Sequence, residues 1–278
     1  MFHILSNKNG SFMLMLIALI TASIITVLSP LIFNEHLDNE HISTKMVVKA
    51  LSNQGIELVE YDDKYYEEYI ILDQYPRFFH MWQSDSFLLI YEFSSLMQRV
   101  EAERVWAEKK GVSGYANAFA YPIMYPIKNV MIEYHPPLSA AFYAEYMSIR
   151  EVAFALNDSQ EIVFQGRGDN WAVTYTVRYY ENHFMDESNR LHVDTYHIDT
   201  GNLEYIGEND DDIPCIDYTL ERPSGGGSSG SGLTLNEHNK TNLGGGGGNG
   251  ARPTADAKIL FSVSWNDQSE SITLSAQQ

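Results

Sequence analysis

The stretch WAVTYTVRYY, residues 171–180, decides the fold of the C-terminal part of this chain. Large apolar residues such as Trp171 and Val173 occupy every second position and alternate with small or polar ones, which is the period of a β-strand with one buried face. Similar patterns occur at 190–198, 203–206, 215–221, 258–265 and 270–274. The last two patterns are joined by Asn266 and Asp267, which favours a tight hairpin. Short strands at this spacing predict an immunoglobulin-like β-sandwich over residues 159–278.

Two glycine-rich stretches interrupt these strands, SGGGSSGSG at 224–232 and GGGGGNG at 244–250. Glycine loses more backbone entropy on ordering than any other residue, so we expect flexible loops at both places. Alternatively, backbone amides could gather there into an anion-binding nest or a partner-binding loop. An engineered linker is a weaker interpretation, because strand-like sequence resumes after each stretch and the two stretches differ.

Residues 42–158 mix helical and strand patterns and predict a small α+β domain. Ser43 can cap a helix that stops at Gly55, and Ser95 and Gln98 have the spacing of a capping box at the start of a second helix. A third helix is expected after Pro136-Pro137, ending at 157–158. Strands are expected at 56–61, 86–93, 118–124 and 128–134. We expect the helices to cover one face of a mainly antiparallel sheet.

Toward the N-terminus, residues 12–33 (FMLMLIALITASIITVLSPLIF) contain no charged side chain. At ~1.5 Å per helical residue this stretch reaches about 33 Å, close to the ~30 Å hydrocarbon core of a bilayer. It predicts a transmembrane anchor at the N-terminus of a chain whose fold class is α+β. Residues 34–41 would then be a linker between the anchor and the first domain. A cleaved signal peptide and a buried core helix are the alternatives, but the stretch is long for a signal core and lacks a good small-x-small cleavage pattern.

Charge on the two sides of this stretch predicts its orientation. Lys8 precedes it, whereas Glu35 and Asp38 follow it, so the positive-inside rule puts residues 1–11 in the cytoplasm. The predicted localisation is therefore the cell membrane, single-pass, with residues 34–278 extracytoplasmic. The predicted partner on this basis is the membrane itself, reached through a single N-terminal helix.

The composition of the chain limits which classes of partner it could bind. The formal net charge of −19 repels phosphate backbones and anionic headgroups, so we expect no nucleic-acid binding. The chain has one cysteine, Cys215, so an internal disulfide is impossible. A cysteine-poor exported chain fits a bacterial surface. We interpret Cys215 as a small buried hydrophobic residue.

The C-terminal residues resemble a family. The pattern FQGxGxNW at 164–171, YxLExPSGGG at 218–227, the glycine run at 244–250 and IxFxVxWN at 259–266 resembles the C-terminal region of uncharacterised exported lipoproteins and membrane-anchored proteins of Gram-positive, spore-forming bacteria. Residues 42–158 are similar more loosely. This chain lacks the acylated cysteine of the lipoprotein members. The resemblance implies an extracytoplasmic location and brings no activity and no site residues.

Several constellations suggest chemistry, and each has a simpler interpretation. His192, Asp194, His197 and Asp199 could bind zinc but fit a solvated strand face better, and 208–212 (ENDDD) could bind calcium but lacks the ligand spacing of a known calcium loop. The sequence GGSSG at 226–230 matches G-x-S-x-G only in letters, because that motif needs a strand-to-helix turn. Arg167-Gly168-Asp169 is interpreted as a hairpin turn.

We therefore assign no catalytic, cofactor-binding or metal-binding residues and no cofactor. Dense aromatic residues, among them Tyr61, Tyr75 and Trp82, are compatible with a binding surface or with ordinary packing. The predicted function is non-catalytic binding, sensing or interaction at the cell envelope, with a protein or envelope polymer as partner. The alternatives are an accessory subunit of a membrane complex, or an envelope enzyme acting on wall polymer through acids such as Glu92 or Glu133.

Overall fold

The computed structural model describes residues 41–61, 67–82, 84–110, 122–137, 143–208, 213, 215–223 and 225–277. In these residues three α-helices and one short 3₁₀ helix, Glu67–Tyr69, accompany thirteen strands. The fold is therefore mostly β, and the predicted α+β class with a transmembrane helix and an immunoglobulin-like sandwich is wrong. Residues 42–278 group as one compact unit, and the predicted division near 158/159 stays a prediction.

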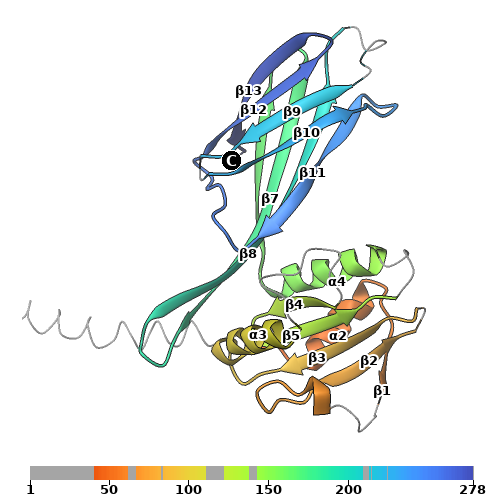
Figure 1. The fold of residues 1–278 in the computed structure, drawn as a ribbon, viewed down its shortest axis with the longest axis vertical. Coiled ribbons are helices and arrows are strands. Elements are labelled where there is room, and N and C mark those ends of the chain that lie inside the picture. The colour runs from red at the N-terminus through yellow and green to blue at the C-terminus, as the bar shows by residue number, and fades with distance from the viewer. Residues whose placement is uncertain are drawn as a thin grey trace, which may run out of the picture. The chain divides into compact units, whose positions relative to one another are not determined.

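The first sheet is antiparallel and has five strands in the order β1-β2-β3-β5-β4 (Figure 1). Its strands are β1 Leu58–Tyr61, β2 Arg77–Met81, β3 Phe87–Glu92, β4 Ile123–Ile127 and β5 Val130–His135. The strands predicted at 56–61, 86–93 and 128–134 are confirmed. Of the strand predicted at 118–124, residues 123 and 124 lie in β4, residue 122 precedes that strand, and 118–121 lie outside the described residues.

Helices cover both faces of this sheet, whereas the sequence predicted one covered face. Helices α2 (Thr44–Asn53) and α4 (Tyr143–Leu156) pack on the face that carries Leu88 and Ile90. Helix α3 (Leu96–Lys110) packs on the opposite face, against Leu89 and Tyr91. The physical reason is in the sequence of β3, FLLIYE, which is apolar on both faces instead of alternating with polar residues.

The predicted capping residues lie at the ends of the first two helices. Ser43 Oγ accepts a hydrogen bond from the Met46 N–H, and Gly55 follows the helix with a φ of 80°. At the start of α3, Ser95 Oγ accepts from the Gln98 N–H at 3.1 Å. The Gln98 side chain reaches back to the N–H of Ser94, one residue earlier than an ideal capping box requires.

The second sheet is antiparallel and has eight strands in the order β10-β9-β12-β13-β6-β7-β8-β11. Its strands are β6 Gln160–Arg167, β7 Trp171–Met185, β8 Leu191–Tyr205, β9 Ile216–Glu221, β10 Gly227–Leu233, β11 Lys240–Gly248, β12 Lys258–Trp265 and β13 Gln268–Ala276. The hairpin predicted at Asn266-Asp267 is confirmed, because both residues have positive φ and Trp265 pairs with Gln268.

This single sheet replaces the two sheets of the predicted sandwich. It coils around a core that contains Trp171, Phe164 and Phe261, so its inward faces pack against one another. Coiling also brings together strands from opposite ends of the strand order. Tyr218 on β9 donates a hydrogen bond to the carbonyl of Leu243 on β11.

Both glycine-rich stretches form strands, β10 and β11, where the sequence predicted loops at 224–232 and 244–250. Cross-strand hydrogen bonding holds them, and two local features need glycine. Gly244 has a φ of 78° where the register of β11 shifts in a bulge. At Gly245 a Cβ atom would lie 2.1 Å from the carbonyl oxygen of Asp199 on β8.

The predicted membrane architecture is also corrected. In the part of the chain that the structure describes, no helix is long and apolar enough to cross a membrane. The longest, α3, has 15 residues and is rich in charged side chains. The finding contradicts the predicted localisation, a single-pass membrane protein with residues 34–278 extracytoplasmic. The predicted anchor, 12–33, lies outside the described residues.

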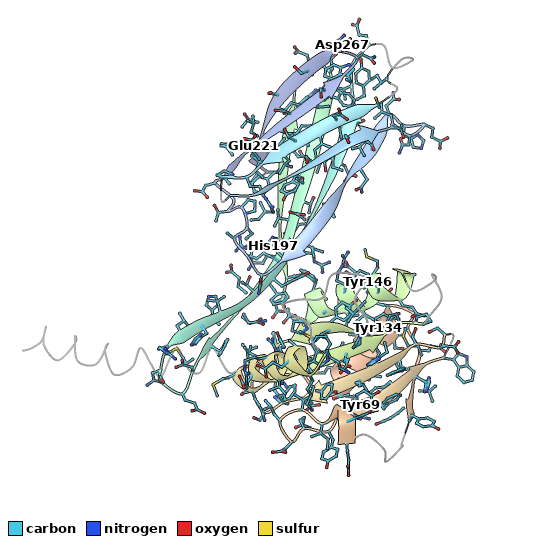
Figure 2. The ribbon with its side chains drawn as sticks, viewed as in Figure 1. Tyr69, Tyr134, Tyr146, His197, Glu221 and Asp267 are labelled. Atoms are coloured by element: carbon cyan, nitrogen blue, oxygen red, sulfur yellow. The ribbon has the colours of Figure 1, made fainter. Side chains whose placement is uncertain are left out.

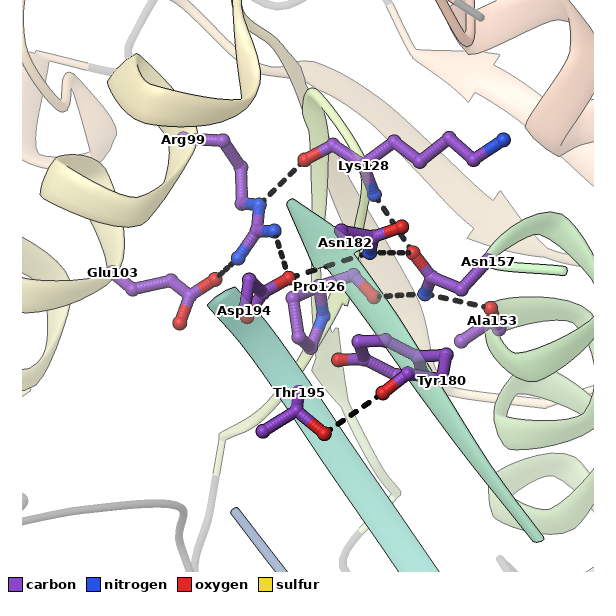
Figure 3. Close-up of polar contacts among 10 residues, drawn as sticks. All are labelled: Arg99, Glu103, Pro126, Lys128, Ala153, Asn157, Tyr180, Asn182, Asp194 and Thr195. Carbon is purple, nitrogen blue, oxygen red and sulfur yellow. Dashed lines mark hydrogen bonds and ion pairs between the residues drawn. The ribbon is translucent and has the colours of Figure 1, made fainter. Parts of the chain in front are cut away.

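A buried polar network joins the β7–β8 hairpin to the helices of the first sheet (Figure 3). Arg99 of α3 is fully buried and donates to the Asp194 carboxylate of β8, to Glu103 and to the carbonyl oxygen of Lys128. Beside it, the Asn182 side chain of β7 donates to Asn157 Oδ1 at 2.9 Å. These contacts fix the long hairpin against α3 and the end of α4.

Candidate functional site

A cleft of about 440 Å³ lies between the two edge strands of the second sheet. Strands β10 and β11 follow each other in the chain, yet they stand at opposite ends of the strand order and do not pair in the described residues. We call this space the glycine cleft. Its walls are 227–229 and 244–247, and its floor carries Tyr175, His197, Asp199, Tyr218 and Arg222.

The walls of the glycine cleft are backbone and small side chains. Glycines 244–247 contribute no side chain to it, and Ser228 contributes a hydroxyl. Ser228 pairs with Leu220, which is buried, so its side chain lies on the inward face of β10. A ligand can therefore approach the peptide groups of both edge strands directly.

Asp199 is the centre of the cleft floor. Its carboxylate accepts hydrogen bonds from Tyr175 Oη at 2.6 Å, Arg222 Nη1 at 3.0 Å and the Gly246 N–H at 2.6 Å. Burial and the adjacent Asp199 carboxylate raise the pKa of Tyr175, which therefore stays protonated as a donor. Three donors, from β7, from the residue that follows β9 and from β11, thus hold one carboxylate, and this arrangement fixes the edge strand to the floor.

His197 lies two residues before Asp199 on the same strand face and is only 7% exposed (Figure 2). Its imidazole lines the cleft and has no hydrogen-bond partner among the residues that the structure describes, whereas its backbone lies between β7 and β11. Burial lowers the pKa of His197; the Asp199 carboxylate opposes this effect, and the cations Arg222 and Arg252 add to it. A neutral imidazole in this place offers a ligand one donor and one acceptor.

The lowered pKa predicts how stability depends on pH. As the pH falls below ~6.5, the unfolded chain binds a proton at His197 before the folded chain does. The contribution of His197 to the unfolding free energy is therefore complete above that pH and is lost as the pH falls. We expect the unfolding free energy, measured by urea titration from pH 7.5 to pH 5, to fall more steeply for the wild type than for His197→Gln. Parallel curves would contradict this account.

The residues considered for zinc separate in the structure. His197 and Asp199 enter the glycine cleft, whereas Asp194 is held by Arg99 and His192 lies 2.9 Å from the Asp186 carboxylate. In the described residues no group of three or more His, Cys, Asp or Glu side chains could hold a metal ion. For the calcium hypothesis, residues 209–212 lie outside the described part.

The two acids considered for catalysis lie on opposite faces of the first sheet. Glu92 accepts hydrogen bonds from the backbone and hydroxyl of Thr44, at the start of α2. Glu133 is 1% exposed and lies within 3.0 Å of both His135 Nε2 and Lys110 Nζ. Burial raises its pKa, but hydrogen bonds from His135 and Lys110 outweigh this, and the net pKa of Glu133 is lowered. Both carboxylates are tied to structural partners.

Other expectations change as well. Among the dense aromatic residues considered for a binding surface, Tyr61, Tyr75 and Trp82 are exposed. Four further tyrosines of that set lie outside the described residues: Tyr65, Tyr66, Tyr115 and Tyr121. Cys215 is exposed, not buried as predicted, because it precedes β9.

Two short motifs of the sequence lie in the described residues, the Arg167-Gly168-Asp169 turn and the G-x-S-x-G letters at 226–230. The predicted turn at Arg167-Gly168-Asp169 is present, and Glu270 accepts from its Asp169 N–H. The G-x-S-x-G letters fall on β10 and the residue before it, with no following helix.

Sequence reasoning did not find the cluster of Tyr175, Asp199 and Arg222, which come from β7, β8 and the residue after β9. Its one available signal was the pair of glycine runs that frame the cleft. Comparisons with protein-family models, with curated proteins and with solved structures give no match. The resemblance to exported proteins of Gram-positive bacteria therefore stays a prediction.

Proposed function

We propose that this chain is a non-catalytic binding protein whose glycine cleft takes an extended segment of a partner protein. The observation that carries the proposal is the pair of edge strands, β10 and β11, which flank a cleft and do not pair with each other in the described residues. An edge strand presents backbone N–H and C=O groups that can pair with an added strand. Glycine and serine leave those groups accessible from within the cleft.

The cleft floor supports recognition of polar groups on the bound segment. The His197 imidazole has no hydrogen-bond partner within the described part of the chain, and the Asp199 carboxylate is already held by Tyr175, Arg222 and Gly246. A carboxylate held by three donors is suited to shaping the floor more than to transferring protons. The chain's net charge of −19 favours a neutral or basic segment, because long-range attraction raises the rate of encounter.

The test begins with a random library of ten-residue peptides panned against the full-length chain. A retained peptide is then titrated by fluorescence anisotropy against two variants. Ser228→Trp fills the cleft from β10, while Ser264→Trp places the same side chain on the exposed outer face of β12. We expect Ser228→Trp to weaken binding at least about tenfold, ~1.4 kcal/mol, and Ser264→Trp to bind as the wild type does.

Equal affinity of both variants would place peptide binding elsewhere and contradict the proposal. Failure to retain any peptide, while a glycan array gives saturable binding that Ser228→Trp removes, would show that the cleft takes a saccharide and would also contradict it. Circular dichroism checks that both variants fold, so a loss of binding can be assigned to the cleft.

A further inference from the structure

A second cavity lies where the β7–β8 hairpin meets the first sheet and its helices. About 60 Å³ of it is open to the centres of water molecules. We call it the aromatic cavity. It is lined by residues that include Trp106, Tyr146, Arg150, Phe154, Tyr180 and Tyr196. Tyr146, labelled in Figure 2, and Arg150 belong to α4. Trp106 belongs to α3, and Tyr180 and Tyr196 come from β7 and β8. The glycine cleft shares no residue with it.

The size of the aromatic cavity suits a small organic molecule. A single water needs about 10–15 Å³ by this measure, so the space exceeds that of one water several times. Aromatic walls gain little from contact with water and favour a planar apolar group, which they can contact face to face or edge to face. Pockets of this kind, apolar with few polar groups, are typical of small-molecule sites.

Trp106 and Arg150 each have a buried donor without a hydrogen-bond partner among the described residues. Trp106 is 2% exposed, and its Nε1–H makes no hydrogen bond in the described residues. The Nε–H of Arg150 is likewise buried without an acceptor there. Leaving a buried donor unpaired costs ~1–3 kcal/mol. An acceptor group of a ligand would remove this cost at both positions.

Arg150 also lacks a counter-charge in the described part of the chain. Its guanidinium lies 5.6 Å from the centre of the Tyr146 ring and forms no ion pair there. The carboxylate next to it in sequence, Glu151, is paired with Arg178 instead. A partly buried arginine without a carboxylate is costly, and a planar carboxylate is the group that its fork of N–H donors fits best.

We propose that the aromatic cavity binds a small aromatic carboxylate, with the ring among Tyr146, Phe154 and Tyr196 and the carboxylate at Arg150 and the Trp106 N–H. The ligand then contacts helices of the first sheet and the hairpin of the second at once. Binding at this site does not depend on the glycine cleft.

The test uses the indole N–H signals in ¹H–¹⁵N spectra of the full-length chain, with Trp106→Phe to assign the signal of Trp106. The probes are benzoate and phenylacetate, and the neutral control is benzamide. We expect the two acids to move the Trp106 signal saturably below about 10 mM and benzamide to bind at least about tenfold more weakly. Arg150→Met keeps most of the apolar stem and should remove that preference for the acid.

Arg167→Met is the matched control, because Arg167 is exposed and does not line the cavity. It should bind benzoate as the wild type does. If Arg150→Met fails to fold, Arg150→Lys serves instead and should bind benzoate more weakly than the wild type, because lysine lacks the planar fork. A Trp106 signal unmoved by either acid, or equal binding of benzoate and benzamide, would overturn the proposal.

Discussion

Replacing Arg99 by methionine is expected to destabilise the protein by about 3–5 kcal/mol, the cost of breaking a buried ion pair from one side. Arg99 is fully buried, and the Asp194 side chain that it holds is 7% exposed. Methionine would leave that carboxylate in the interior, with the Asn182 amide at 3.4 Å as its remaining donor in the described residues. The carbonyl oxygen of Lys128 would lose a 2.6 Å hydrogen bond as well.

Urea titration measures this change, and the same helix offers a matched control. Arg104 also pairs with two carboxylates, Glu101 and Glu108, but its side chain is 56% exposed. Arg104→Met should therefore change the unfolding free energy far less than Arg99→Met does, because solvent screens an exposed ion pair. Similar effects of the two substitutions would show that burial of the Arg99–Asp194 pair does not matter, contrary to this account.

The second large effect is expected at Gly245. In the wild type, a Cβ atom at this position would lie 2.1 Å from the Asp199 carbonyl oxygen. Gly245→Ala must therefore push β11 away from β8 and should cost about 1–3 kcal/mol, as overpacking does. Because Gly246 donates to Asp199, the same displacement should disturb the floor of the glycine cleft.

Gly248→Ala is the control for that substitution. It lies in the same strand, and the nearest atom to a Cβ there is 3.9 Å away. Its unfolding free energy should stay within about 0.5 kcal/mol of the wild type, as at an ordinary surface position. If both glycines tolerate alanine equally in urea titration, then β11 does not pack against β8 as closely as described.

Local structure could be predicted from this sequence because its signals are local. Ser43 and Ser95 cap the helices that they were expected to cap, and the alternation at 171–180 marks the inward face of β7. The turn at Asn266-Asp267 follows from the tolerance of both residues for positive φ. Each of these features depends on a few neighbouring residues.

Features that depend on distant contacts could not be predicted. Runs of glycine indicate loops by composition, and only pairing with β9 and β8 makes strands of β10 and β11. Nor does alternation say whether inward faces belong to two sheets or to one coiled sheet. The continuous apolar pattern of Phe87–Glu92 was the available signal for a sheet covered on both faces.

The candidate sites also depend on contacts between residues that are distant in sequence. Tyr175 and Asp199 meet because β7 pairs with β8, and Arg222 reaches them because the second sheet coils. Arg150 and Trp106 share a cavity because α3 and α4 both border the β7–β8 hairpin there. Neither set has a spacing that a motif could capture, so the chemistry of both sites depends on the fold.

Amide hydrogen exchange on the full-length chain, with and without a peptide retained from the library, tests the central claim most directly. Pairing of an added strand protects backbone N–H groups of the strand that receives it. The account predicts new protection in Gly227–Leu233 and Lys240–Gly248, with β12 and β13 unchanged. Protection confined to other segments, with both glycine-rich strands exchanging as before, would contradict it.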